Sequence, residues 1–165
     1  MDISLYIFLG IIIAVVIVIL VIKGFKSTKT DKEQFISDLK YLNYEISDTN
    51  ILDANITAVR DEKKFLIKFI KSERYADVSI NNKTTFEIKY GGSNDPGKPH
   101  PYHKFVPGLN KFMNEPTDYI KVIVIVPKPK KIVRWVNENE IEFVTSSSNV
   151  YGAKVIAFDD LSLFK

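Results

Sequence analysis

The chain contains no cysteine, only two histidines and a single tryptophan among its 165 residues. Without cysteine the protein forms no disulfide bond, and zinc sites built from thiolate ligands are excluded. Glycine and proline number seven each, and they form neither a Gly-rich phosphate loop nor the sharp Gly-x-Ser-x-Gly turn of serine hydrolases. Nucleotide hydrolysis by a P-loop and hydrolysis by an activated serine are therefore not expected. The lack of cysteine also fits a reducing compartment.

One long apolar run is present, Ile3–Ile22, and only Ser4, Tyr6 and Gly10 interrupt it. A helix of about 20 residues spans about 30 Å, which is the thickness of the hydrocarbon core of a bilayer. A cleaved signal peptide would carry basic residues before its apolar run, whereas this run is preceded by Met1 and the acidic Asp2. We therefore predict a transmembrane anchor over residues 1–23, with the lipid bilayer as its partner.

The charges beside this run predict its orientation. Four lysines follow it within ten residues: Lys23, Lys26, Lys29 and Lys32. Because basic residues stay on the cytoplasmic side, we expect the N-terminus outside and the remainder of the chain in the cytoplasm. Residues 24–30 then form a basic juxtamembrane linker that could contact anionic lipid head groups. Residues 31–165 are long enough for one globular domain.

The pattern of the remaining residues predicts a domain of mixed composition. Thr30 and Glu33 form a capping box, and apolar residues at helical spacing follow, so we expect a helix from about residue 31 to 44. Strands are expected over residues 55–60, 64–70, 75–80, 84–90, 119–126, 141–145 and 153–158, and further helices over residues 107–113 and after Pro129. This order predicts an α+β or α/β domain with a mixed central sheet flanked by helices.

The second predicted hairpin, around the turn Asn81-Asn82-Lys83, carries the candidate chemistry. A three-residue turn would pair Asp77 with Glu87 across the two strands, and alternation would place Lys89 on the same face. Two facing carboxylates repel each other unless a cation lies between them. Mg²⁺ is the natural cation for such oxygen ligands, and a neighbouring lysine would stabilise the charge of a transition state during phosphodiester hydrolysis.

The spacing of Asp77, Glu87 and Lys89 resembles the PD-(D/E)xK signature of restriction-endonuclease-like nucleases, and the stretch Phe86–Tyr90 is similar to the motif strand of the nuclease-related domain. The resemblance implies a restriction-endonuclease-like fold, metal binding by Asp77 and Glu87, and a catalytic role for Lys89. It also implies that Glu33 on the first helix is a candidate additional acid. The chain departs from the signature in having alanine before Asp77, and the glutamine-containing helix that often follows the motif strand is not evident.

Other residues offer alternatives. A second Glu-x-Lys, starting at Glu62, falls on a predicted turn, so its side chains would not converge, and the bare pattern therefore also arises by chance. His100 and His103, with Asp95, form a conceivable metal site, and the competing interpretation is a surface loop. A basic cluster beside the tryptophan could bind the phosphate backbone of nucleic acid or could be a solvated helix face; it consists of Lys128, Lys130, Lys131 and Arg134.

Two functions follow from this reading. The first is a membrane-anchored, Mg²⁺-dependent nuclease-like domain that hydrolyses phosphodiester bonds of nucleic acid at the cytoplasmic face of the membrane. The second is a non-catalytic, membrane-anchored scaffold or interaction module that binds protein partners. The formal net charge of +3 permits nucleic-acid binding without requiring it.

Overall fold

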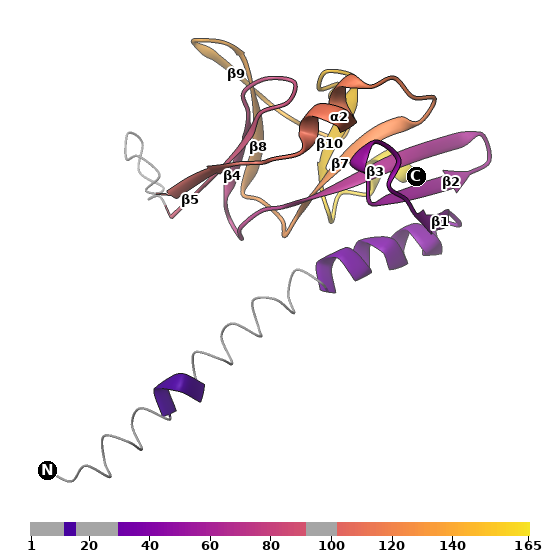
Figure 1. The fold of residues 1–165 in the computed structure, drawn as a ribbon, viewed down its shortest axis with the longest axis horizontal. Coiled ribbons are helices and arrows are strands. Elements are labelled where there is room, and N and C mark those ends of the chain that lie inside the picture. The colour runs from indigo at the N-terminus through magenta and orange to yellow at the C-terminus, as the bar shows by residue number, and fades with distance from the viewer. Residues whose placement is uncertain (1–11, 16–29, 92–101) are drawn as a thin grey trace, which may run out of the picture.

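The computed structural model describes residues 12–15, 30–91 and 102–165. After a helix over residues 30–41, the described part is built mainly from β-strands and short helical turns (Figure 1). In chain order these are β1 (Glu45–Asp48), η1 (Ile51–Asp53), β2 (Ile56–Arg60), β3 (Lys63–Lys71), β4 (Asp77–Ile80), β5 (Phe86–Tyr90), β6 (Tyr102–Phe105), α2 (Leu109–Asn114), β7 (Ile120–Val126), β8 (Lys131–Asn137), β9 (Glu140–Phe143), β10 (Ala153–Ala157) and η2 (Ser162–Phe164).

The strands form two five-stranded mixed sheets (Figure 1). The first sheet has the order β1-β2-β3-β7-β10, in which β3, β7 and β10 run parallel to one another and β2 runs antiparallel to both of its neighbours, β1 and β3. The second sheet has the order β6-β5-β4-β8-β9, in which β4 and β8 run parallel. Each sheet therefore combines a hairpin with a crossover.

Strand β7 contributes side chains to both hydrophobic cores because its sequence is almost entirely aliphatic and β-branched. Side chains alternate along a strand, so Val122 and Val124 enter one hydrophobic core and Ile123 and Ile125 enter another. All four side chains are fully buried. Continuous apolar strands of this kind are typical of a sheet that is covered on both faces.

The helix over residues 30–41 covers one face of the first sheet. Phe35 and Leu39 lie one turn apart on this helix and pack against Phe65 and Ile67 of β3. Phe164 closes the same core from the C-terminal end, and its ring contacts those of Phe35 and Phe65 edge-on. These contacts make a layer of helix against sheet.

The second sheet covers the opposite face of the first. Val78 and Ile80 of β4 and Phe86 of β5 point into the core between the two sheets. Phe112 of α2 is buried in the same core, so this short helix fills one end of the space between the sheets. The domain therefore has three layers, which are helix, first sheet and second sheet.

The predicted fold class is wrong. Instead of one central sheet flanked by helices, the described residues form two sheets packed face to face, with a helix on one outer side only. The main error is the helix predicted after Pro129, where β8 is found. Ile132, Trp135 and Val136 imitate helical spacing, but the segment is rich in β-branched residues, and pairing with β4 and β9 stabilises it as a strand. Strands β1 and β6 were also not predicted.

The predicted transmembrane anchor and the single-pass membrane localisation derived from it are not supported. Within the described ranges no helix is long and apolar enough to cross a bilayer. Residues 12–15 of the predicted anchor form a helical turn; the other residues of the anchor over 1–23, and residues 24–29 of the predicted linker, lie outside the described residues. The prediction was made from the length and hydropathy of the run, which are properties of the sequence alone.

Candidate functional site

The predicted hairpin lies in the second sheet, and its polar side chains point away from the first sheet. We call this surface the outer face. Residues paired across neighbouring strands point to the same side, so the register defines its members: His103 and Phe105 on β6, Glu87 and Lys89 on β5, Asp77 and Ser79 on β4, Lys131, Val133 and Trp135 on β8, and Ile141 and Phe143 on β9. Phe105, Trp135, Ile141 and Phe143 on this face are exposed, whereas Asp77, Ser79, Glu87 and Val133 at its centre are buried.

The hairpin of β4 and β5 forms as predicted, but its register differs by two residues. Asp77 pairs with Lys89, and Ser79 pairs with Glu87. The predicted direct pairing of Asp77 with Glu87 is therefore wrong, and the two carboxylates are diagonal neighbours. The loop is longer than the predicted three residues because the side chain of Asn82 accepts hydrogen bonds from the backbone N–H groups of Thr84 and Thr85, which is the usual role of asparagine in turns.

Glu87 is the centre of a compact set of polar contacts. Its Oε1 lies 3.2 Å from Nδ1 of His103, and its Oε2 lies 3.4 Å from Nζ of Lys89. Oε2 also accepts a hydrogen bond of 3.2 Å from the amide of Asn81. The residue is only 9% exposed, and a buried carboxylate requires such partners to remain charged. Most of the His103 side chain is exposed, at 58%, so Glu87 holds a ring that solvent can reach.

The same contacts continue across the sheet as a chain of hydrogen bonds. The indole Nε1 of Trp135 donates to Oγ of Ser79 at 2.9 Å. Ser79 Oγ donates to Oδ1 of Asn81 at 3.0 Å, and Asn81 donates onward to Glu87. Four strands are thereby joined, from β8 through β4 and β5 to β6, and the position of Glu87 is fixed from both sides.

Asp77 has a different set of neighbours. It lies between Lys89 and Lys131 in the register, and Lys131 Nζ is 3.2 Å from its Oδ2. The predicted metal ligands Asp77 and Glu87 each therefore have an ammonium group beside them, and Mg²⁺ held between them would compete with these groups. No group of three or more potential ligands gathers among the described residues. The fit to a two-carboxylate magnesium site is poor.

The structure separates the four residues of the predicted basic cluster. Lys131 pairs with Asp77, and Arg134 points to the inner side of β8, where its guanidinium contacts Glu142. Lys128 donates to Asp159 at 2.6 Å, and this hydrogen bond raises the pKa of Lys128. Lys128 and Lys130 line a separate pocket. A shared phosphate-binding surface made of all four is therefore not formed.

Of the other candidate site residues named from the sequence, one lies far from the hairpin and two lie outside the described residues. Glu33 is exposed on the helix over residues 30–41, on the far side of the first sheet from the hairpin, so it does not join the site. His100 and Asp95 lie outside the described residues. The contact between His103 and Glu87 was not predicted, because His103 was assigned to a loop. The sequence of Tyr102–Phe105 does not alternate, because two polar residues lie between its two aromatic ones, so no local pattern predicted this strand.

Comparisons with protein-family models, with curated proteins and with solved structures found no match to this chain.

Proposed function

We propose that the outer face cleaves phosphodiester bonds of RNA by acid–base chemistry at His103. Glu87 is its positioning residue, and Lys89 supplies the positive charge beside the phosphate. The observation that carries the proposal is the pairing of a buried carboxylate with an accessible imidazole, 3.2 Å apart, with an ammonium group 3.4 Å from the same carboxylate. A base held by a third group is the usual arrangement for proton transfer in catalysis.

Proton positions follow from the contacts. Nδ1 of His103 donates to Glu87, so Nε2 is the nitrogen that accepts a proton from the substrate. In RNA that proton belongs to a 2′-hydroxyl group. As Nε2 takes it, the O2′–P bond forms and the P–O5′ bond breaks, leaving a 2′,3′-cyclic phosphate. The leaving 5′-oxygen takes a proton from water, and the resulting hydroxide takes the proton held by His103.

RNA is the preferred substrate class because it carries its own nucleophile. The 2′-hydroxyl group removes the need for a metal-bound hydroxide, which suits a site whose carboxylates are already paired with cations. Lys89 then stabilises the negative charge that develops on the phosphate oxygens.

The exposed aromatic residues on the same face support binding of unpaired bases. Phe105 lies on the edge strand β6, beside the site, Phe143 lies on the opposite edge strand β9, and Trp135 lies on β8 next to it. They are 58%, 39% and 63% exposed, respectively. Aromatic side chains on an open sheet stack with the bases of single-stranded nucleic acid, at about 1–3 kcal/mol per base.

The test is a cleavage assay of the full chain with single-stranded RNA and with DNA of the same sequence. We expect cleavage of RNA alone, a 2′,3′-cyclic phosphate product, and equal rates in EDTA and in Mg²⁺. His103→Ala is expected to lose activity and Lys63→Gln, at the far turn of β3, to retain it. Cleavage of both substrates only with Mg²⁺, lost in Asp77→Asn, would contradict this mechanism and would support the metal-dependent nuclease instead.

A non-catalytic interaction module is the second candidate. It is favoured by the exposed apolar side chains Ile141 and Phe143 on β9, since clustered apolar residues on a surface mark binding sites. The same assay separates the two functions. If RNA remains intact with the folded chain, the cleavage proposal fails and the interaction module is the remaining candidate.

A further inference from the structure

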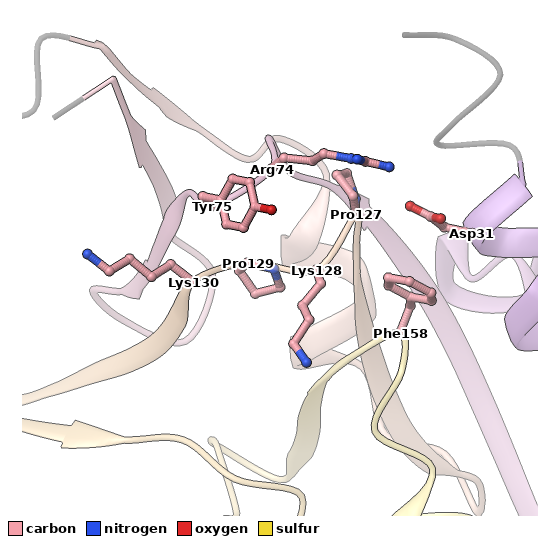
Figure 2. Close-up of a pocket in the computed structure, with 8 residues that line it drawn as sticks. All are labelled: Asp31, Arg74, Tyr75, Pro127, Lys128, Pro129, Lys130 and Phe158. Atoms are coloured by element: carbon pink, nitrogen blue, oxygen red, sulfur yellow. The ribbon is translucent and has the colours of Figure 1, made fainter. Parts of the chain in front are cut away.

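A second site lies at the edge of the first sheet, away from the Glu87–His103 pair. The parallel strands β3, β7 and β10 end at this edge, and a cavity of about 420 Å³ opens beyond them (Figure 2). Its lining comes from the segments that follow each strand and from the start of the first helix: Arg74, Tyr75, Pro127, Lys128, Pro129, Lys130, Phe158 and Asp31. Ligands commonly bind at the carboxyl ends of parallel strands.

The segments around this cavity are held together by backbone hydrogen bonds. The N–H of Ser72 donates to the carbonyl of Val126 at 2.7 Å, and the N–H of Lys130 donates to the carbonyl of Ala76 at 2.8 Å. The segments after β3 and β7 are thus tied together on both sides of the opening. A preformed cavity of this kind loses little conformational entropy when a ligand binds.

The walls of the cavity are mainly apolar and its rim is cationic. Figure 2 shows the ring of Tyr75 on one side of Pro127 and Pro129 and the ring of Phe158 on the other. The described lining includes three basic residues, Arg74, Lys128 and Lys130, and the acidic Asp31; Lys128 is paired with Asp159 outside the lining, so Arg74 and Lys130 carry the cationic character of the opening. This combination favours a ligand with a flat apolar part and a negative group.

Tyr75 provides an independent observation. Its φ is 60°, in the left-handed region that bulky residues rarely adopt. Its side chain is 81% exposed, so the ring gains little from burial that would offset this strain. Strained residues of this kind cluster at ligand sites, and the exposed ring is placed to stack on a bound aromatic group.

We infer that this cavity binds a phosphorylated nucleoside, with the base against Tyr75 and Phe158 and the phosphate held by the guanidinium of Arg74. Arginine suits the phosphate because its planar group donates two parallel hydrogen bonds. Lys130 adds positive charge at the opening. The chemistry is shared by a free nucleotide and by the phosphorylated end of an RNA strand, and the site does not require that the outer face be catalytic.

Binding of AMP, adenosine and inorganic phosphate to the full chain, measured by calorimetry, tests this inference. We expect AMP to bind at least tenfold more tightly than either adenosine or phosphate. A 5′-phosphorylated RNA oligonucleotide, compared with the same oligonucleotide bearing a 5′-hydroxyl group so that binding at the outer face cancels, identifies the source: tighter binding of the phosphorylated strand assigns an RNA end, and equal binding of the two strands assigns a free nucleotide. Absence of AMP binding, or equal binding of phosphate alone, overturns the inference.

Two variants locate the site. Arg74→Gln removes the guanidinium and Tyr75→Gly removes the ring at a φ that glycine adopts freely, and each is expected to weaken AMP binding at least tenfold. Lys63→Gln, which removes one positive charge at the opposite end of β3, is the matched control and should bind AMP as the unmodified chain does. AMP binding that is unchanged in both Arg74→Gln and Tyr75→Gly contradicts the assignment. Urea unfolding of each variant confirms that the domain is folded.

Discussion

Nδ1 of His103 on β6 lies 3.2 Å from Oε1 of Glu87 on β5, although the two residues are diagonal rather than direct partners in the register. The direct partner of Glu87 is Phe105, and that of His103 is Lys89. The imidazole of His103 therefore extends diagonally from β6 to the carboxylate of Glu87 on β5. This contact joins a strand that the sequence predicted to one that it did not, and the proposed chemistry depends on it.

The contribution of the Glu87 charge can be measured by replacing this residue with glutamine. Glu87→Gln preserves the size of the side chain and an oxygen acceptor for His103 but removes the negative charge. We expect RNA cleavage to fall by about tenfold, and to fall by about 10²–10⁴-fold in His103→Ala, because a general base typically contributes that factor. Profiles of kcat/KM against pH should differ between Glu87→Gln and the unmodified chain. Identical profiles would contradict a positioning role for Glu87.

The hydrogen bond between Trp135 and Ser79 is expected to stabilise the second sheet. Trp135→Phe removes the donor to Ser79 Oγ, and Ser79→Ala removes the acceptor. Each change should lower the free energy of unfolding by about 1 kcal/mol, the usual net contribution of one such bond. Urea denaturation of both single variants and of the double variant gives the coupling between them. Strictly additive effects would show that this bond contributes nothing.

Tyr75→Gly should make the domain more stable while weakening its ligand site. The left-handed conformation costs a residue with a side chain about 1–2 kcal/mol, and glycine avoids this cost but gains freedom in the unfolded chain. We expect a net rise of about 0.5–1 kcal/mol in the free energy of unfolding. Tyr41→Gly provides a comparison, because Tyr41 is exposed at the end of the first helix without a left-handed φ. A loss of stability in Tyr75→Gly would contradict the strain argument.

The buried phenol of Tyr44 predicts a loss of stability at high pH. Burial raises the pKa of Tyr44 above its ordinary value of 10.0, although the nearby Arg60 opposes this change. Since the folded protein holds the proton more tightly than the unfolded chain, the contribution is complete below pH 10 and is lost as the pH rises through the folded pKa. Urea midpoints measured from pH 8 to pH 11 should fall less steeply for Tyr44→Phe. Parallel curves for the two proteins would contradict the prediction.

Phe164, near the C-terminal end of the chain, packs into the core beneath the first helix. It is fully buried, and its ring contacts those of Phe35, Tyr44 and Phe65. Phe164→Ala should lower the free energy of unfolding by about 3–5 kcal/mol, the usual cost of removing a buried phenylalanine. Leu163→Ala, at a partly buried neighbour, should cost much less when both are measured by urea denaturation.

Elements with strong local patterns were predicted from the sequence. The first helix, β2, β3, β5 and β7 form close to their expected positions, because capping residues, alternation and β-branched runs act over a few residues. The strand over residues 131–137 was not predicted, since the spacing of its apolar residues fits both a helix and a strand. Its pairing with β4 and β9 decided the outcome.

The candidate site likewise combines features that the sequence predicted with features that it did not predict. Alternation along β4 and β5 correctly placed Asp77, Glu87 and Lys89 on one face, whereas the hairpin register depended on the loop held by Asn82. The approach of His103 to Glu87, and that of Lys131 to Asp77, involve strands brought from elsewhere in the chain. No spacing in the sequence encodes such contacts, so the cations beside both carboxylates were found only in the structure.

The sequence by itself determined which side chains share a face of β4 and β5 and where the first helix lies, because periodicity and capping are local properties of the chain. The tertiary structure alone decided that the ten strands of the described residues divide into two packed sheets, which partners surround Glu87, and that the carboxyl ends of β3, β7 and β10 meet around a cavity. Those features depend on pairing between distant segments, where the free energy of burying two apolar faces together selects among arrangements that local patterns allow equally.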